Sequence, residues 1–280
     1  MHTRYIDTHC HVNFNRFKKN RSEVITAASD VGVSTLIVPG SNIVSSQKAV
    51  ELAGEYEGLY AAIGLHPHHV YDVQSVGDTN AQIEELEKLV QHPKVVAIGE
   101  VGLDKHEYQK TVYVNYTITP EFLEKQKELL ARQIQLAVLH KKSLILHNRE
   151  AKEALLPLLE KVWNSELEHH TVFHCCEADR ELLLFAQKHH LFIGVDGDVT
   201  FSKEKAHFIG EVPLEMLVLE TDSPFLLPEP LKSQKKYPNV PANIPLIASC
   251  VAKIKGIPAG EVAKITTENA VTLFRLPQSE

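Results

Sequence analysis

Two histidines near the start of the chain are spaced so that they can bind one metal ion together. His9 and His11 follow directly after a short apolar run that begins at Tyr5. On a β-strand, residues i and i+2 point to the same side of the sheet. Neutral imidazole is a common metal ligand. A single H-x-H pair also arises by chance, so a metal site requires further ligands elsewhere in the chain.

Four later apolar runs also end in a histidine or an acidic residue. These side chains are Glu100 and Asp104 after Val95–Ile98, His147 after Leu144–Leu146, His174 after Thr171–Phe173, and Glu220 and Asp222 after Met216–Leu219. Each one alone has a structural explanation, such as a surface histidine, a helix cap or the start of a turn. Their recurrence at five predicted strand ends favours a shared site. The set is large enough for two divalent ions bridged by one carboxylate, most naturally Glu100.

The types of ligand indicate the class of metal and of reaction. Imidazole and carboxylate groups without thiolate fit Zn, Mn or Mg. Two such ions a few ångströms apart can stabilise the attacking and leaving oxygens of a displacement at phosphorus. Asp222 is suited both to bind an ion and to accept a proton from the attacking water. We therefore predict a hydrolase with Asp222 and Glu100 as its catalytic residues.

The elements that position these side chains alternate between strands and helices. The apolar, β-branched runs that predict strands are Tyr5–Thr8, Thr35–Val38, Leu59–Ile63, Val95–Ile98, Leu144–Leu146, Thr171–Phe173, Leu191–Val195 and Met216–Leu219. Helical spacing occurs in Ser22–Val31, Ile43–Tyr56, Ala81–Val90, Pro120–His140, Lys152–Trp163, Arg180–His189, Lys203–Ile209, Ile244–Lys255 and Ala259–Leu273. This order favours an α/β fold, a (β/α)8 TIM-like barrel, over a doubly wound open sheet. In such a barrel, the carboxyl ends of all strands face one site.

Composition restricts the class of protein. The chain has 280 residues, 44% of them hydrophobic and 23% charged, which is typical of a soluble globular protein without membrane contact. A net charge of -7 argues against a protein that coats nucleic acid. It is compatible with a nuclease, because bound metal ions supply local positive charge. The four cysteines form no C-x-x-C motif, so we expect reduced thiols in a cytoplasmic protein and no thiolate zinc site.

Several motifs, taken together, resemble one known family. They are Asp7-Thr8-His9-Cys10-His11, Gly64-Leu65-His66-Pro67-His68, Gly99-Glu100-Val101-Gly102-Leu103-Asp104, His147-Asn148-Arg149-Glu150-Ala151, His174-Cys175, Glu220-Thr221-Asp222-Ser223-Pro224, Asn239-Val240-Pro241-Ala242-Asn243 and Thr267-Glu268-Asn269-Ala270. In this order they resemble the TatD family of metal-dependent DNases, which belongs to the amidohydrolase-like metallohydrolases. The resemblance spans nearly the whole chain.

The resemblance implies one TIM-like barrel domain over residues 1–280. It implies that His9, His11, Glu100 and Asp222 bind one metal ion, and that Glu100, His147 and His174 bind a second. The implied activity is metal-dependent hydrolysis of DNA phosphodiester bonds, 3′-5′ exonuclease-like, on single-stranded DNA or 3′ ends. Mg or Mn are the implied ions, with Zn as an alternative.

Three further residues are candidates for substrate binding. His66 and His68 follow the third predicted strand, where they either bind a phosphate or pack against the barrel. Arg149 follows the ligand His147 and either pairs with phosphate or forms a structural ion pair with Glu150 or Glu177. We expect His66, His68 and Arg149 to contact the substrate.

The chain departs from the family pattern close to the ligands. Asn13, Asn148 and Glu150 replace the usual residues, and Cys175-Cys176-Glu177-Ala178 follows His174 where the family has an aromatic residue, Ser and Gly. The segment Lys105–Ile118 is longer than the usual connection. Its three tyrosines (Tyr108, Tyr113 and Tyr116) either stack on unpaired bases or pack the segment on the barrel. Cys10, between two ligands, is expected in the core.

Two alternatives to a deoxyribonuclease remain. The same ligands serve enzymes that hydrolyse another ester or amide bond, in a small molecule or an aminoacyl-tRNA. A partner subunit that had lost catalysis would keep the fold but not the ligands, and here all six ligands are present.

Overall fold

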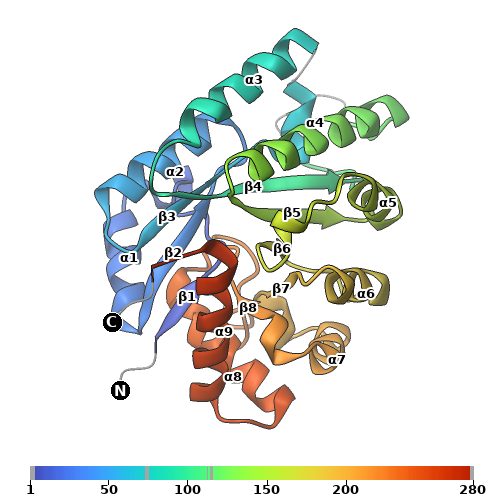
Figure 1. Cartoon of the computed structure of the whole chain (residues 1–280). Helices are drawn as coiled ribbons and strands as arrows, with labels where there is room; N and C mark the ends of the chain where they lie inside the picture. The colour runs from blue at the N-terminus through green and yellow to red at the C-terminus, as the bar shows by residue number, and fades with distance from the viewer. Residues whose placement is uncertain (1–3, 73–75, 112, 114–115, 278–280) are drawn as a thin grey trace.

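Eight parallel strands form one sheet in which each strand pairs with the next one in the chain. The computed structural model describes residues 4–72, 76–111, 113 and 116–277 (Figure 1). The strands are β1 (Tyr5–Asp7), β2 (Val33–Pro39), β3 (Leu59–Ile63), β4 (Val95–Asp104), β5 (Ser143–Arg149), β6 (Thr171–Phe173), β7 (Phe192–Val195) and β8 (Leu217–Leu219). The predicted strand order is confirmed.

The first and last strands meet just beyond their ends. Thr8 N–H donates to the Leu219 carbonyl at 3.0 Å, and His11 N–H donates to the Ser223 carbonyl at 2.8 Å. Cys10 and Ser223 form a parallel bridge. These bonds bring the sheet nearly to closure, which excludes the doubly wound open sheet and confirms the (β/α)8 barrel.

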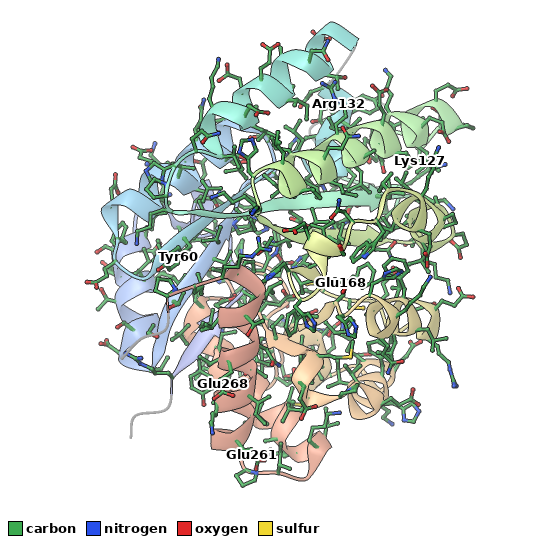
Figure 2. All side chains as sticks on the ribbon, viewed as in Figure 1. Tyr60, Lys127, Arg132, Glu168, Glu261 and Glu268 are labelled. Carbon is green, nitrogen blue, oxygen red and sulfur yellow. The ribbon has the colours of Figure 1, made fainter. Side chains whose placement is uncertain are left out.

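Helices surround the barrel (Figure 1). They are α1 (Arg21–Asp30), α2 (Ile43–Glu55), α3 (Val76–Leu89), α4 (Pro120–Leu139), α5 (Lys152–Val162), α6 (Arg180–Lys188), α7 (Lys203–Glu211), α8 (Ile244–Lys255) and α9 (Ala259–Phe274). Both helices predicted after the last strand are present, and α9 lies against β1 and β8. Charged side chains such as Lys127 on α4 and Glu261 on α9 project outward (Figure 2). No helix in the described ranges combines the length and the apolar character that crossing a membrane requires.

Local sequence explains where several helices begin. The Thr119 side chain accepts a hydrogen bond from Phe122 N–H, and Pro120 occupies the first helical position of α4. Asn42 and Ser45 form a capping box at the start of α2. Each cap satisfies N–H groups that have no partner inside the helix.

The core inside the barrel takes one apolar residue from each strand. These are Ile6, Ile37, Ala62, Ala97, Ile145, Val172, Phe192 and Val218, with Leu273 and Phe274 of α9 packed against them. On the strands that carry candidate ligands, these apolar residues come before the ligands in the sequence. The packed layer therefore supports the candidate ligands, which are at the carboxyl ends.

Strand β4 is longer than predicted, and this difference matters for the site. The apolar pattern ends at Ile98, but the strand continues to Asp104, and Gly102 pairs with His147 of β5. A Cβ atom at Gly102 would lie 1.9 Å from the His147 carbonyl oxygen, so only glycine allows this close approach. The extension brings Glu100 and Asp104 beside β5.

Candidate metal centre

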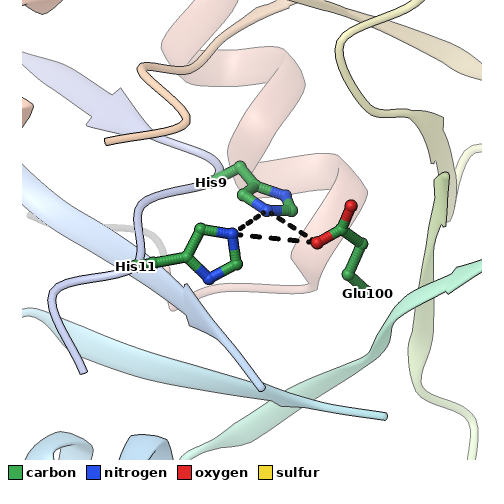
Figure 3. Close-up of side chains that lie close together, drawn as sticks. All are labelled: His9, His11 and Glu100. Carbon is green, nitrogen blue, oxygen red and sulfur yellow. Dashed lines mark hydrogen bonds and ion pairs between the residues drawn. The ribbon is translucent and has the colours of Figure 1, made fainter. Parts of the chain in front are cut away.

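His9, His11 and Glu100 meet at the carboxyl end of the barrel, as the sequence predicts. The two imidazole Nε2 atoms are 3.2 Å apart. Glu100 Oε2 lies 3.5 Å from His9 Nε2 and 3.7 Å from His11 Nε2 (Figure 3). Asp222 Oδ1 lies 3.4 Å from His11 Nε2 and 3.9 Å from His9 Nε2. The four residues predicted to bind the first ion therefore face one point.

The second carboxylate oxygen of Glu100 faces another group of imidazoles. Its Oε1 lies 2.8 Å from His147 Nδ1, 3.4 Å from His66 Nε2 and 3.8 Å from His174 Nε2. The ligand atoms of His66, Glu100 and His147 all lie within 4.8 Å of one another. Glu100 is thus oriented with one oxygen toward each group, which is the geometry of a bridging carboxylate.

Two carboxylates contact the ring nitrogens of His147 and His174 that do not face Glu100. Asp104 Oδ2 lies 3.1 Å from His147 Nε2, and Glu220 Oε1 lies 3.1 Å from His174 Nδ1. Both acids are fully buried. Carboxylates in this position fix the orientation of a ligand imidazole and increase its basicity. Asp104 and Glu220 lie at predicted strand ends, but the apolar pattern alone does not indicate this orienting role. The signal for it is that metal-binding imidazoles usually pair with a carboxylate through their second ring nitrogen.

The donor set fits a divalent cation. His9 and His11 are buried, and their Nε2 atoms face each other and Glu100 Oε2. Burial and the neighbouring His174 hold the pKa of His9 well below its usual range, so this ring is neutral. Two imidazole nitrogens facing a carboxylate oxygen are a ligand set for Zn, Mn or related ions.

Without an ion, protons neutralise part of the site. Burial lowers the pKa of His147, but its hydrogen bonds with Asp104 and Glu100 raise it to about 9. Burial acts in the same direction on His174, yet the Glu220 carboxylate raises that pKa to about 10. Burial raises the pKa of Glu100, but the surrounding imidazoles hold it well below its usual range. Protonated His147 and His174 therefore offset part of the carboxylate charge at the site.

The three candidate substrate contacts line a pocket of about 640 Å³ above these groups. His66 lies so close to Glu100 that it belongs to the second ligand group. His68 Nε2 is 2.8 Å from Thr111 Oγ1, so His68 also contacts the Lys105–Ile118 segment. Arg149 donates to the Tyr108 hydroxyl at 3.2 Å and lies over its ring. Glu177 instead accepts hydrogen bonds from the Asn148 side chain and Glu150 N–H.

The tyrosines of Lys105–Ile118 pack mainly against the barrel, although residues 112, 114 and 115 lie outside the described ranges. Tyr113 donates to Asp72 at 2.6 Å, and Tyr116 packs between Tyr71 and Phe122. Tyr108 donates to Asp104 at 2.7 Å and lines the pocket. Only Tyr108 of the three lines the pocket. Cys10 is fully buried, as expected.

Residues 6–275 match the model of the TatD related DNase family. The chain belongs to this family. It is 33% identical over 264 residues to the 3′-5′ ssDNA/RNA exonuclease TatD of Escherichia coli, covering 93% of this chain and 95% of the relative. It is also 33% identical to the uncharacterized metal-dependent hydrolase YabD of Bacillus subtilis, covering 96% of this chain and 98% of the relative. The TatD-family assignment makes this chain a metal-dependent hydrolase.

Solved TatD-family structures have the same fold. YjjV, a TatD homologue from Escherichia coli, superposes with a TM-score of 0.84 at 28% identity, covering 99% of this chain and 100% of that one. A TatD-family hydrolase from Entamoeba histolytica superposes with a TM-score of 0.82 at 22% identity, over 99% and 100% of the two chains. The barrel described above is therefore the TatD-family barrel.

Proposed function

We propose that this protein is a deoxyribonuclease that removes nucleotides from the 3′ end of single-stranded DNA. The observation that carries the proposal is the orientation of Glu100, with one oxygen toward each of two ligand groups at the floor of an open pocket. Ions held at these two groups would suit a displacement at phosphorus. A relative named as a 3′-5′ ssDNA/RNA exonuclease supports the choice of nucleic acid.

The proposed ligand sets follow the two faces of Glu100. His9, His11, Glu100 and Asp222 would hold one ion, and Glu100, His147 and His174 would hold the second, with His66 beside it. We propose Mg or Mn as the ions, with Zn as the alternative. Divalent ions held there would lower the pKa of water and neutralise charge on the phosphoryl group.

The side chains around the ions have separate roles in this proposal. Asp222 accepts the proton of the attacking water, because its carboxylate lines the pocket and lies beside His11. Arg149 and His68 line the same pocket and bind the phosphate and sugar of the terminal nucleotide. Glu100 holds the two ligand groups together, and Asp104 and Glu220 keep the imidazoles in place.

The charge next to the pocket supports recognition of a strand end. A separate recess of about 730 Å³ shares Cys175, Glu177 and Asp198 with the pocket, and acids outnumber lysines in its lining. The acids are Glu150, Glu153, Glu177, Asp179, Asp198 and Glu204. Phosphates avoid such a surface. A strand therefore enters from the side of Tyr108 and Arg149, and its end stops at the metal centre.

The direct test is digestion of single-stranded DNA labelled at either end, with Mg, Mn or Zn. The 3′ label should be released as mononucleotide before the 5′ label, and Asp222→Asn should abolish release. Glu268→Gln is a matched control, because Glu268 is exposed on α9 (Figure 2). DNA that stays intact with every ion, or equal digestion by Asp222→Asn, would overturn the proposal.

A second candidate is hydrolysis of an ester or amide in a small molecule or an aminoacyl-tRNA. The acid-lined recess beside Cys175 favours it, since this surface suits a cationic group better than a phosphate. Turnover of neutral and cationic carboxyl esters, measured with the same protein and ions, tests this candidate. Ester turnover with intact DNA would replace the first proposal by the second.

A further inference from the structure

The Tyr108 hydroxyl connects the rim of the pocket to the second ligand group. It donates a hydrogen bond to Asp104 Oδ2 at 2.7 Å and accepts one from Arg149 at 3.2 Å. The same Asp104 oxygen lies 3.1 Å from His147 Nε2, and His147 Nδ1 lies 2.8 Å from Glu100 Oε1. A continuous row of polar contacts therefore runs from Arg149 to the carboxylate that faces both ligand groups.

Asp104 can orient His147 only if its own carboxylate is fixed. Asp104 is fully buried, and its Oδ1 accepts a hydrogen bond from His106 N–H at 2.8 Å. Its Oδ2 is shared by the Tyr108 hydroxyl and the His147 imidazole. Without that hydroxyl, the imidazole would be the partner that remains on Oδ2 in the part of the chain that the structure describes. The carboxylate would then be held less firmly, because a buried acceptor has lost a donor.

The aromatic ring of Tyr108 makes a second and separate set of contacts. The Arg149 guanidinium lies over the ring, 5.1 Å from its centroid, where the face of an aromatic ring attracts a cation. The imidazoles of His68 and His106 contact the same ring in edge-on geometry, with centroids 5.2 Å and 4.8 Å away. The ring thus holds Arg149 at the rim, whereas the hydroxyl contacts Asp104.

Other residues attach the Lys105–Ile118 segment to the barrel. Tyr113 donates a hydrogen bond to Asp72 at 2.6 Å, and Thr111 Oγ1 lies 2.8 Å from His68 Nε2. These contacts lie outside the ligand groups. Because they anchor the segment, the orientation of Tyr108 toward Asp104 is not needed for that purpose, and a role in the site accounts for it better.

We propose that Tyr108 is a positioning residue of the metal centre. Through its hydroxyl it fixes Asp104 against His147, and through its ring it fixes Arg149 at the rim of the pocket. The inference rests on the second ligand group of the proposed function, and it adds the residue that links this group to the proposed phosphate-binding side chain. Tyr108 acts through these neighbours and needs no contact with an ion.

Metal binding to Tyr108→Phe tests the role of the hydroxyl. In calorimetry on metal-stripped protein, the affinity for Mn²⁺ at the second group should fall about 5-fold, because one hydrogen bond to the orienting carboxylate is lost. In an Asp104→Asn background, the same change should have little further effect, since the hydroxyl acts through Asp104. Tyr113→Phe is the matched control, because it removes a hydroxyl from the same segment whose partner, Asp72, is exposed.

Digestion kinetics test the role of the ring. Tyr108→Phe keeps the ring beneath Arg149, so KM for single-stranded DNA should stay close to that of the wild type. Tyr108→Leu removes the ring as well as the hydroxyl, and KM should rise about 5-fold. An equal rise in both variants would contradict a separate role for the ring.

The inference is overturned if Tyr108→Phe binds Mn²⁺ as tightly as the wild type, or if Tyr113→Phe loses as much affinity. It is also overturned if Tyr108→Phe and Asp104→Asn have independent, additive effects. The calorimetry needs no DNA, so it separates this inference from the proposed function. Weakened ion binding in Tyr108→Phe with DNA left intact removes the nuclease proposal only. Digestion with unchanged ion binding in Tyr108→Phe removes the positioning role only.

Discussion

The backbone N–H of Asp222 donates a hydrogen bond of 2.9 Å to the carbonyl oxygen of His9. The same stretch of backbone bonds that joins β1 to β8 therefore places the ligands at the two ends of the sequence side by side. Asp7 strengthens this junction by accepting hydrogen bonds from Thr221 N–H, the Thr221 hydroxyl and His9 N–H. The hydrogen bonds that join β1 to β8 therefore also bring His9 and Asp222 of the first ligand group together.

Replacing Asp7 should weaken both stability and metal binding. Asp7→Ala leaves the buried N–H groups of His9 and Thr221 without this acceptor and the Thr221 hydroxyl with Ser223 alone. We therefore expect the free energy of unfolding in urea to fall by about 2–4 kcal/mol. Asp7→Asn keeps one acceptor oxygen and should lose less. Burial raises the pKa of Asp7 to about 8, so this carboxyl tolerates an uncharged replacement. Equal stability of Asp7→Ala and wild type would show that the junction is not held by Asp7.

Removing metal should lower the thermal stability of the protein. An ion that binds only the folded state adds about 2.7 kcal/mol of stability at 100 times its Kd. We expect the midpoint of thermal unfolding to fall on chelation and to recover with Mn²⁺. Glu100→Gln should lose most of this recovery. The same recovery in Glu100→Gln as in wild type would contradict a bridging role.

The orienting carboxylates should matter nearly as much as the ligands. Asp104→Asn and Glu220→Gln keep the size of the side chain but weaken the hold on His147 and His174. We expect metal affinity to fall by about 10–100-fold in each, measured by calorimetry on metal-stripped protein. Glu261→Gln changes an exposed acid on α9, far from the site in sequence and on the outer face of the barrel, and serves as the control. Unchanged affinity in both orienting variants would mean that packing alone positions the imidazoles.

Arg149 should act on substrate binding more than on the chemical step. In the proposed enzyme, Arg149→Ala removes a cation from the rim of the pocket, so KM for single-stranded DNA should rise by about 10-fold with a smaller change in kcat. Arg149→Lys should recover part of the loss, because it keeps the charge without the bidentate geometry. A loss confined to kcat would instead place Arg149 in the chemistry.

Asp179 should stabilise the fold in a pH-dependent way. Its carboxylate caps α6 by accepting from Glu181 and Leu182 N–H groups, and it pairs with Lys152. Burial raises the pKa of Asp179, but these partners outweigh burial and lower it below the usual value. A depressed folded pKa gives stability that is complete above the unfolded pKa of about 3.9 and is lost as pH falls through the folded pKa. Asp179→Ala should therefore cost about 1 kcal/mol at pH 7 in urea unfolding, and this cost should decrease as pH falls through the folded pKa of Asp179.

Local patterns in the sequence were sufficient for the elements and for the position of each candidate ligand. An apolar run or a helical spacing depends only on the burial of its own segment, so it can be recognised in the sequence. Because strands and helices alternate regularly in this chain, the eight strands of the barrel could be identified one by one. His9, His11, His147, His174 and Asp222 each follow such a run, so their place at a strand end could be predicted. The family motifs then identified the TatD barrel, and the match of residues 6–275 to the TatD related DNase family confirms it.

Relationships between strands required the tertiary structure. The register that seats Gly102 against His147 extends β4 and brings Asp104 behind the imidazole, although the apolar pattern ends at Ile98. The same packing puts His66 beside Glu100 and turns the Cys175 thiol toward His174 and Asp222. Sequence alone determined which side chains reach the mouth of the barrel. Only the pairing of the strands in the barrel decided which of them meet, because distances between strands depend on hydrogen-bond register and not on the periodicity of any one strand.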